Sequence, residues 1–269
     1  MKADVFSIAG EKVKTIDLPN HFSEEIRPDV IRKSALSVRN SLRQPYGAYE
    51  RAGKRYKAKL SRRRRDYKTS YGHGMARVPR KTVWHRGRQF GWVGAEAPGT
   101  TGGRRAHPPK PGRDWDQKVN KKERKKAIRS AISASINKEL LLKNGFSYSN
   151  SLPIIIDGLE NINKTKDLLN LFKKIGLEKD LQRLERTVRP GRGKSRGRPY
   201  KSKVGPLVIV SKESKTIDNL EGFNSCLVNN LNSLLLAPSL IPGRLTIWSL
   251  DSINKLEKEK LFANEKVKK

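Results

Sequence analysis

The stretch "LPIIID" at residues 152–157 decides the fold, because its three isoleucines form an uninterrupted apolar run between a proline and an aspartate. Such a run is typical of a strand that is buried on both faces of a parallel sheet. Similar short runs follow as "PLVIV" (206–210), "CLV" (226–228) and "RLTIW" (244–248). Strands of this kind, alternating with helices, predict a parallel sheet with helices on both faces.

Helical patterns separate these strands. Leu168, Leu171, Phe172 and Ile175 lie at the spacing of one helix face, and Gly176 ends that predicted helix. The shorter patterns contain Leu181 and Leu184, then Ile217 and Leu220, and finally Ile253, Leu256 and Leu261 after a capping Ser249.

The chain before "LPIIID" adds a hairpin and two long helices. The hairpin is predicted near residues 4–18, and Pro28 opens a helix that Pro45 and Gly47 stop. A second helix begins at the capping pair Asn120 and Glu123 and continues to Gly145. We therefore expect one α/β globular domain over residues 1–269, Rossmann-like, with a mostly parallel sheet flanked by helices.

The composition points to a polyanionic partner. The 269 residues carry 59 Lys and Arg against 26 Asp and Glu, a formal net charge of +33. Because such a charge repels itself, nucleic acid is the first candidate partner and an anionic membrane surface the second. No run of about 18 apolar residues predicts a membrane span, and the N-terminus has no pattern of a secretory signal. The single Cys226 fits a reducing cytosol and a buried, unreactive thiol.

The excess charge is concentrated between Arg43 and Arg113. These 71 residues hold 20 Lys and Arg against three acids, a net of +17, together with 11 of the 21 glycines and six of the 14 prolines. A segment this charged cannot bury a core of its own. We expect residues 45–114 to form a basic arm, a long extended loop inserted between the first two long helices and ordered by its partner.

The sequence contains no complete nucleotide-binding motif and no metal-binding motif. "GHGMAR" (72–77) has Arg77 where the third glycine of a dinucleotide fingerprint belongs, and "GRGKS" (191–195) has Val188 in place of the first glycine of a phosphate loop. Neither has a predicted strand before it. The four histidines and one cysteine show no metal-ligand spacing, so we expect no enzyme, no cofactor and no metal.

Aromatic residues and glycines alternate with the cations of the arm, among them Tyr46, Tyr49, Tyr56, Trp84 and Phe90. Rings stack on unpaired bases while cations bind phosphates, which suits folded RNA. Glycines let a chain pass close to RNA. The alternative interpretation is a flexible loop with a few local contacts. A second basic loop at 189–203 has seven cations and no acid, and it predicts either another RNA contact or a solvated surface loop.

Several uncommon motifs occur in one order: "YGHGMARVPR" (71–80), "GGRRAHPPK" (102–110), "KKERKKAIRSAISAS" (121–135), "GRGKSRGRPYK" (191–201) and "APSLIPGRLTIW" (237–248). They resemble the archaeal and eukaryotic branch of the family of large-subunit ribosomal protein number four. The resemblance spans about residues 3–250. The absence of a long C-terminal extension favours an archaeal member.

The resemblance implies a structural rRNA-binding protein in the cytoplasmic ribosome. Its partners would be large-subunit rRNA, neighbouring ribosomal proteins including number twenty-two, and the nascent peptide in passing, with no membrane. The arm would thread into the rRNA, and its tip would help line the peptide exit tunnel. Within residues 77–92, the residues assigned to the tip are Arg80, Lys81, Trp84, His85 and Arg86.

The residues expected to bind rRNA are the cations and selected aromatic residues of the arm and of the loop at 189–203. They are Arg51, Lys54, Arg55, Lys57, Lys59, Arg62, Arg63, Arg64, Arg65, Tyr67, Lys68, Tyr71, Arg77, Arg80, Trp92, Arg104, Arg105, His107, Lys110, Arg113, Arg189, Arg192, Lys194, Arg196, Arg198, Tyr200 and Lys201. Two other functions stay open from the residues alone: a nucleic-acid-binding enzyme with a basic docking arm, and a free RNA-binding regulator.

Overall fold

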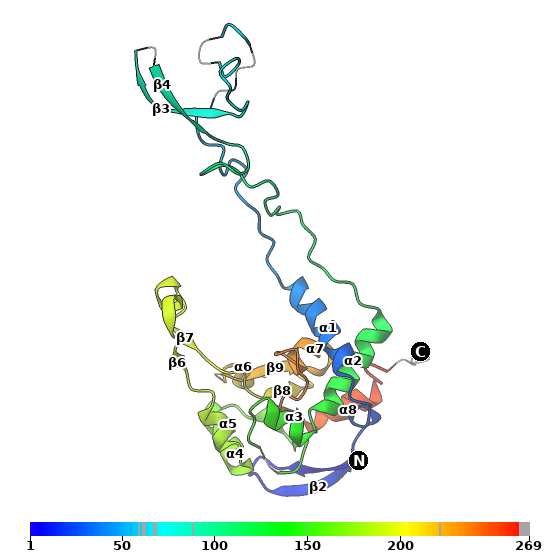
Figure 1. Cartoon of the computed structure of the whole chain (residues 1–269). Coiled ribbons are helices and arrows are strands. Elements are labelled where there is room, and N and C mark those ends of the chain that lie inside the picture. Colours follow the sequence, from blue (N-terminus) through cyan, green and yellow to red (C-terminus); the bar gives the residue numbers. More distant parts are fainter. Residues whose placement is uncertain are drawn as a thin grey trace. The chain divides into compact units, whose positions relative to one another are not determined.

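The structure is a computed structural model, and it describes residues 1–58, 60, 63–66, 69–87, 89–148, 150–220 and 222–263 (Figure 1). The chain divides into two compact units. The globular unit is Met1–Leu42 with Asp116–Lys269, and the arm unit is Arg43–Trp115.

The globular unit contains a six-stranded sheet in the order β2-β1-β5-β10-β8-β9. Its strands are β1 (Lys2–Phe6), β2 (Lys12–Asp17), β5 (Ile154–Ile156), β8 (Leu207–Val210), β9 (Asn224–Leu227) and β10 (Thr246–Ser249). The neighbouring pairs β1–β5, β5–β10, β10–β8 and β8–β9 are parallel, and β2 runs antiparallel to β1 at the edge of the sheet. The predicted strands, the N-terminal hairpin and the mostly parallel sheet are thus confirmed.

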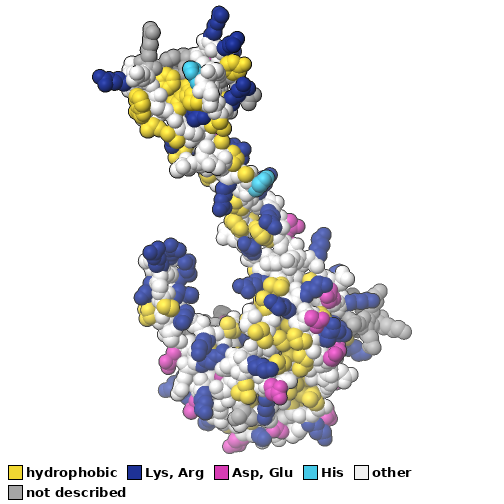
Figure 2. Space-filling view, viewed as in Figure 1, with side chains coloured by type: hydrophobic (Ala, Val, Ile, Leu, Met, Phe, Trp, Pro, Cys, Tyr) yellow, Lys and Arg dark blue, Asp and Glu magenta, His cyan; other side chains and the backbone are white. Residues whose placement is uncertain are grey.

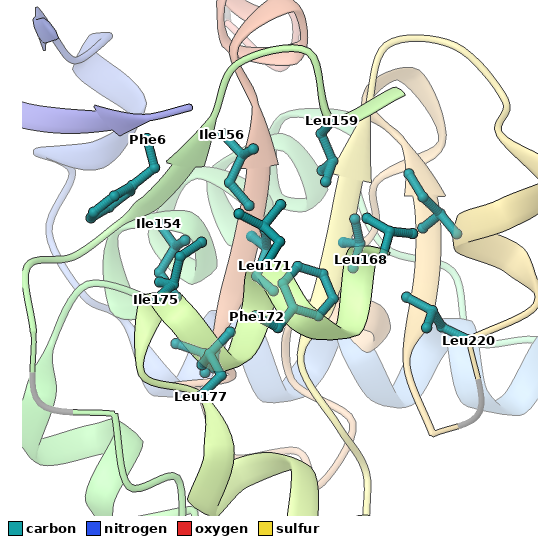
Figure 3. Close-up of a cluster of buried hydrophobic side chains, with 14 of the residues drawn as sticks. Phe6, Ile154, Ile156, Leu159, Leu168, Leu171, Phe172, Ile175, Leu177 and Leu220 are labelled. Atoms are coloured by element: carbon teal, nitrogen blue, oxygen red, sulfur yellow. The ribbon is translucent and has the colours of Figure 1, made fainter. Parts of the chain in front are cut away.

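Each face of the sheet has its own hydrophobic cluster, because successive side chains of a strand point to opposite faces. Ile154 and Ile156 of β5 belong to one cluster, whereas Ile155 belongs to the other. The first face is covered by α4 (Thr165–Ile175), whose Leu171 and Phe172 are buried (Figure 3).

The opposite face is covered by α1 (Pro28–Ser41), α2 (Lys121–Ala134) and α8 (Leu250–Lys258). Trp248 is fully buried in this second cluster and meets Phe22 edge-on, with ring centroids 5.3 Å apart. The helices predicted at Pro28, before Gly176 and after Ser249 are confirmed, although the last one ends at Lys258, before Leu261. The Ser249 hydroxyl accepts the backbone N–H of Ser252.

The helix predicted from Asn120 to Gly145 is wrong as a single element. Asn120 makes no side-chain cap, and the helix ends at Ala134. A second helix, α3 (Lys138–Lys143), begins where the Asn137 side chain accepts the N–H groups of Glu139 and Leu140. Asparagine favours this capping role over a helix interior, which explains why the chain breaks there.

The other elements of the globular unit are short. They are α5 (Glu178–Gln182), α6 (Lys215–Asp218), α7 (Ser233–Leu236), the two-residue strands β6 (Thr187–Val188) and β7 (Tyr200–Lys201), and the 3-10 helices η1 (Asn20–Phe22), η2 (Leu159–Asn161), η3 (Gly191–Arg196) and η4 (Val228–Asn230). Among the described residues, no helix is long and apolar enough to cross a bilayer.

The arm unit contains an antiparallel hairpin that the sequence pattern did not predict. Its strands are β3 (Arg80–Arg86) and β4 (Gln89–Gly94). The hairpin has a bulge between Thr82 and Trp84. Its aromatic and β-branched residues favour strands, but their alternation is broken by the bulge and by Gly91, and this hid the pattern.

Candidate nucleic-acid interface

The two limbs of the arm unit, residues 43–58 and 102–115, lie against each other. The backbone N–H of Ala48 donates to the carbonyl oxygen of Pro109 across 2.9 Å. A cavity of about 480 Å³ lies between the limbs and is lined by residues of both. The arm unit therefore has internal contacts of its own, which the composition alone did not indicate.

Two glycines allow the limbs to come this close. A Cβ atom on Gly53 would lie 2.4 Å from the backbone nitrogen of Arg104, and one on Gly47 would lie 2.3 Å from Cδ of Pro111. Both distances are far inside van der Waals contact. At these positions the chain needs glycine because of the opposite limb, a reason different from the approach to RNA that the sequence suggested.

The ends of the arm unit are joined by a stack of rings and guanidinium groups. The guanidinium groups of Arg43 and Arg113 both lie over the Trp115 ring system, with Cζ atoms 3.9 Å and 4.3 Å from its ring centroids. Tyr46 stacks on Trp115 with centroids 5.7 Å apart and planes at 16°. Arg43 and Trp115 were not among the predicted site residues, although both flank the basic arm directly in sequence.

Other tyrosines of the arm unit also lie beside cations of the same unit. The pairs are Arg55 with Tyr49 at 4.5 Å, Lys81 with Tyr56 at 3.9 Å, and Arg77 with Tyr71 at 5.0 Å from the ring centroid. The three tyrosines remain 60%, 43% and 38% exposed. Each pair thus offers a ring and a positive charge together, which is the combination that stacks on a base and contacts its phosphate.

The β3–β4 hairpin presents a second group of aromatic residues. Trp84 is 56% exposed and lies over Gly91, where a Cβ atom would be 2.2 Å from Nε1 of the indole. Phe90 and Trp92 form a tilted pair with centroids 4.7 Å apart. Gly91 therefore provides the space that lets the Trp84 ring lie across the hairpin.

The residues assigned to the tunnel tip all lie on β3. Arg80 and Lys81 are half-buried at its start, and Arg80 donates to the carbonyl oxygen of Ala76. Trp84, His85 and Arg86 are exposed, and they lie closer to the turn.

The predicted rRNA-binding residues of the arm fall into three groups. The exposed ones are Arg51, Lys54, Arg55, Lys57, Arg63, Arg64, Arg65, Tyr71, Arg77, Arg105, His107, Lys110 and Arg113. Those that are half-buried are Arg80, Trp92 and Arg104. The remaining four, Lys59, Arg62, Tyr67 and Lys68, lie outside the described residues.

The predicted basic loop at 189–203 overlaps a small ordered element, which we call the basic finger (Thr187–Lys201). Its strands β6 and β7 pair antiparallel, and η3 lies between them. Arg189 is half-buried beside Gly193, whereas the predicted residues Arg192, Lys194, Arg196, Arg198, Tyr200 and Lys201 are exposed. Lys and Arg side chains gather over the finger in Figure 2. The finger carries positive charge on a fixed backbone, without an acidic residue.

The start of the finger differs from the sequence prediction at one point. A two-residue strand, β6, does precede "GRGKS" at 191–195, whereas the sequence suggested none. It pairs only with β7 and leads into a 3-10 helix, so the strand and α-helix that frame a phosphate loop are still not found here.

The carboxyl ends of the parallel strands are the place where α/β proteins bind nucleotides. Here the Glu160 carboxylate lies at that edge. It accepts hydrogen bonds from the backbone N–H of Ser211 at 2.6 Å, the Ser211 hydroxyl at 3.0 Å and the Ser249 hydroxyl at 2.8 Å. A carboxylate at this position repels a phosphate, so this edge does not suit nucleotide binding. Its hydrogen bonds instead join the ends of strands β5, β8 and β10.

Replacing Glu160 with alanine should lower the free energy of unfolding by about 2–3 kcal/mol, because the donors of Ser211 and Ser249 lose a charged acceptor. Urea denaturation followed by circular dichroism measures the change. Glu185→Ala, which removes an exposed carboxylate, is the matched control and should stay within about 0.5 kcal/mol of the unmodified chain. Equal stabilities of the two variants would show that Glu160 does not join the strands.

Side chains that could hold a metal ion do not cluster among the described residues. No group of three His, Cys, Asp or Glu residues with metal-binding proximity occurs among the described residues. Cys226 is buried in β9, and burial raises the pKa of its thiol to about 11. The thiol is therefore protonated at neutral pH, as expected for a buried cysteine.

Comparisons with known proteins identify the chain's relatives. The profile of the ribosomal protein L4/L1 family matches residues 16–259. A large ribosomal subunit protein uL4 from Nanoarchaeum equitans is 43% identical over an alignment of 267 residues, which covers 97% of this chain and 100% of the relative. The proteins of the same name from Archaeoglobus fulgidus and Methanocaldococcus jannaschii are each 40% identical, covering 95% and 96% of this chain and 98% of each relative.

These archaeal relatives match the globular unit and the arm unit together. The resemblance seen in the ordered sequence motifs is thereby confirmed, including its archaeal branch. With the family profile matched over residues 16–259 and full-length relatives at about 40% identity, the chain belongs to the ribosomal protein L4/L1 family.

Proposed function

We propose that the chain is a structural constituent of the large ribosomal subunit and binds rRNA. The observation that carries this proposal is the match to proteins named large ribosomal subunit protein uL4 over nearly the full length of both chains. The net charge of +33 and the exposed cations of the arm unit and basic finger support it.

The binding is electrostatic, combined with stacking. Exposed arginines and lysines of the arm unit neutralise phosphates and release counterions. Tyr49, Tyr56 and Tyr71 stack on unpaired bases with their exposed faces, while the cation beside each ring contacts the adjoining phosphate. The basic finger makes a second contact from the globular unit. Lys59, Arg62, Tyr67 and Lys68 remain part of the proposed rRNA-binding set from sequence alone.

The finer placement is part of the same proposal. Arg80, Lys81, Trp84, His85 and Arg86 of the β3–β4 hairpin help line the peptide exit tunnel, next to large-subunit protein number twenty-two, and the nascent peptide passes them. The sequence resemblance supports this placement, and so does the exposure of the last three side chains. The chain acts without catalysis, in the ribosome of the cytoplasm.

Sedimentation of a native lysate tests the assembly. The chain, detected by immunoblot, should move with the large subunit, and it should stay there when low magnesium separates the two subunits. A free regulator or a separate enzyme would remain near the top of the gradient. Detection of the chain only in those slow fractions would overturn the proposed function.

A further inference from the structure

A second positively charged surface lies on the globular unit, away from the basic finger. It is a groove of about 880 Å³ between the end of α1, the first turns of α2, η4 and residues 259–262. We call it the α2 groove. Its size is in the range of pockets that hold one small ligand or a nucleotide.

The amino-terminal end of α2 carries positive charge against the helix dipole. Four of the five residues in Lys121–Lys125 are Lys or Arg, and the one acid, Glu123, is paired with Lys33 at 2.8 Å. Cations at this end of a helix are unfavourable, and Asn120 gives no side-chain cap. Breaking a local rule in this way is typical of a functional site, here one that receives an anion.

The groove combines this charge with free amide groups. Arg124 lines it and is exposed, and its guanidinium makes no hydrogen bond or ion pair within the described parts of the chain. Asn229 and Asn230 of η4 line the groove too, and their exposed amides have no partner in the same described parts. Amides of this kind pair with base edges, whereas the cations suit phosphates.

The wall formed by residues 259–262 is held in place from behind. His21 Nε2 lies 2.6 Å from the carbonyl oxygen of Leu261, and Arg129 donates to that of Phe262 across 2.8 Å. Lys125 donates to Ala263 across 2.8 Å. Phe262 has a left-handed φ of 61°, a conformation that costs energy and that the Arg129 contact maintains. The groove is therefore preformed, with the Phe262 side chain along it.

We propose that the α2 groove binds a single-stranded segment of rRNA, separate from the contacts of the arm unit and the basic finger. Arg124, together with Lys121 one helical turn earlier, takes the phosphates. Asn229 and Asn230 take the edges of unpaired bases. Three cations line the groove against the single acid Glu259, so the charge favours a polyanion. This inference rests on the proposed function, since it names a further site for the same RNA.

Thiol labelling tests the site on the full chain. Cys226 is replaced by alanine, and one cysteine is introduced as Asn230→Cys in the groove or as Lys166→Cys on α4, which covers the opposite face of the sheet. The probe is purified large-subunit rRNA, and complex formation is verified by sedimentation. Bound rRNA should slow maleimide labelling at position 230 by at least about 10-fold and leave position 166 nearly unchanged.

A second measurement separates a direct contact from general crowding by RNA. Lys121→Ala with Arg124→Ala should reduce the slope of log affinity against log salt by about 1.4–1.8, which is about 0.7–0.9 for each phosphate that is no longer neutralised. Lys164→Ala with Lys166→Ala removes the same charge from the α4 side. This control variant should reduce the slope only through its lower net charge. Its reduction should therefore be smaller than that of the groove variant. Circular dichroism verifies that each variant is folded.

The outcomes distinguish this inference from the proposed function. If rRNA binds and position 230 labels as fast as in the free chain, the groove is not an RNA site, although the chain still binds rRNA. An identical slope for the two double variants would overturn the inference in the same way. If the unmodified chain forms no complex with rRNA, the proposed function itself fails.

Discussion

Binding of the full chain to large-subunit rRNA should weaken by about 10³- to 10⁵-fold when the salt concentration rises from about 50 to 200 mM. A loss of this size is expected for a protein that contacts about six to ten phosphates. The arm unit and basic finger have more exposed Lys and Arg side chains than that, so they can supply these contacts. Each phosphate contact releases condensed counterions from the RNA, and this release favours binding less when the salt concentration is high. Filter binding over this salt range gives the slope directly.

A variant of the arm unit shows which cations produce the effect. Arg63→Ala, Arg64→Ala and Arg65→Ala, combined in one chain, should reduce the slope by about 0.7–0.9 for each phosphate that these arginines neutralise. The control replaces Lys164, Lys166 and Lys179 with alanine, which removes the same charge from exposed positions near α4 and α5. A nearly flat salt dependence of the unmodified chain would contradict the electrostatic mechanism.

Arg244→Ala should lower the free energy of unfolding by about 3–5 kcal/mol. The Arg244 side chain is only 3% exposed. Its guanidinium donates to the carbonyl oxygens of Gly205, Leu235 and Pro206 and to Oδ1 of Asn224, over 2.6–3.4 Å. Burial lowers the pKa of Arg244 to about 10, so the group stays charged at neutral pH. Removing it leaves several buried acceptors without a donor.

Thermal or urea denaturation measures this loss, which corresponds to a decrease in Tm of roughly 6–20 °C. Arg39→Ala on α1 removes an exposed arginine and should change stability by less than about 0.5 kcal/mol. Arg244→Lys should be intermediate, because an ammonium group cannot donate to all four acceptors at once. If Arg244→Ala were as stable as Arg39→Ala, the buried arginine would not join α7 to the starts of β8, β9 and β10.

The apolar patterns predicted the sheet well. "LPIIID", "PLVIV" and "RLTIW" are strands β5, β8 and β10, because no other conformation buries such short apolar runs as completely. Turn residues such as Gly176 and the capping Ser249 also marked helix ends correctly. Single-residue signals failed where two roles compete. Asn120 resembled a cap and Asn137 resembled a helix residue, and the structure gives the capping hydrogen bonds to Asn137.

The candidate interface was predicted in part. The exposed cations of the arm unit and finger follow from charge, since a side chain this polar stays in solvent without a partner. The pairing of Lys81 with Tyr56 and of Arg43 with Trp115 did not follow, because these residues are far apart in sequence and meet only in the folded arm unit. The α2 groove was missed for the same reason.

The amino-acid sequence by itself determined the α/β class of this protein, its concentration of positive charge and its family, since these depend on local pattern and composition. Only the tertiary structure decided that Arg244 is buried, that Glu160 joins three strands, and that Arg124 shares a groove with Asn229 and Asn230. The physical reason is that burial and hydrogen bonding depend on neighbours in space, and these come from segments about 20 to 100 residues apart.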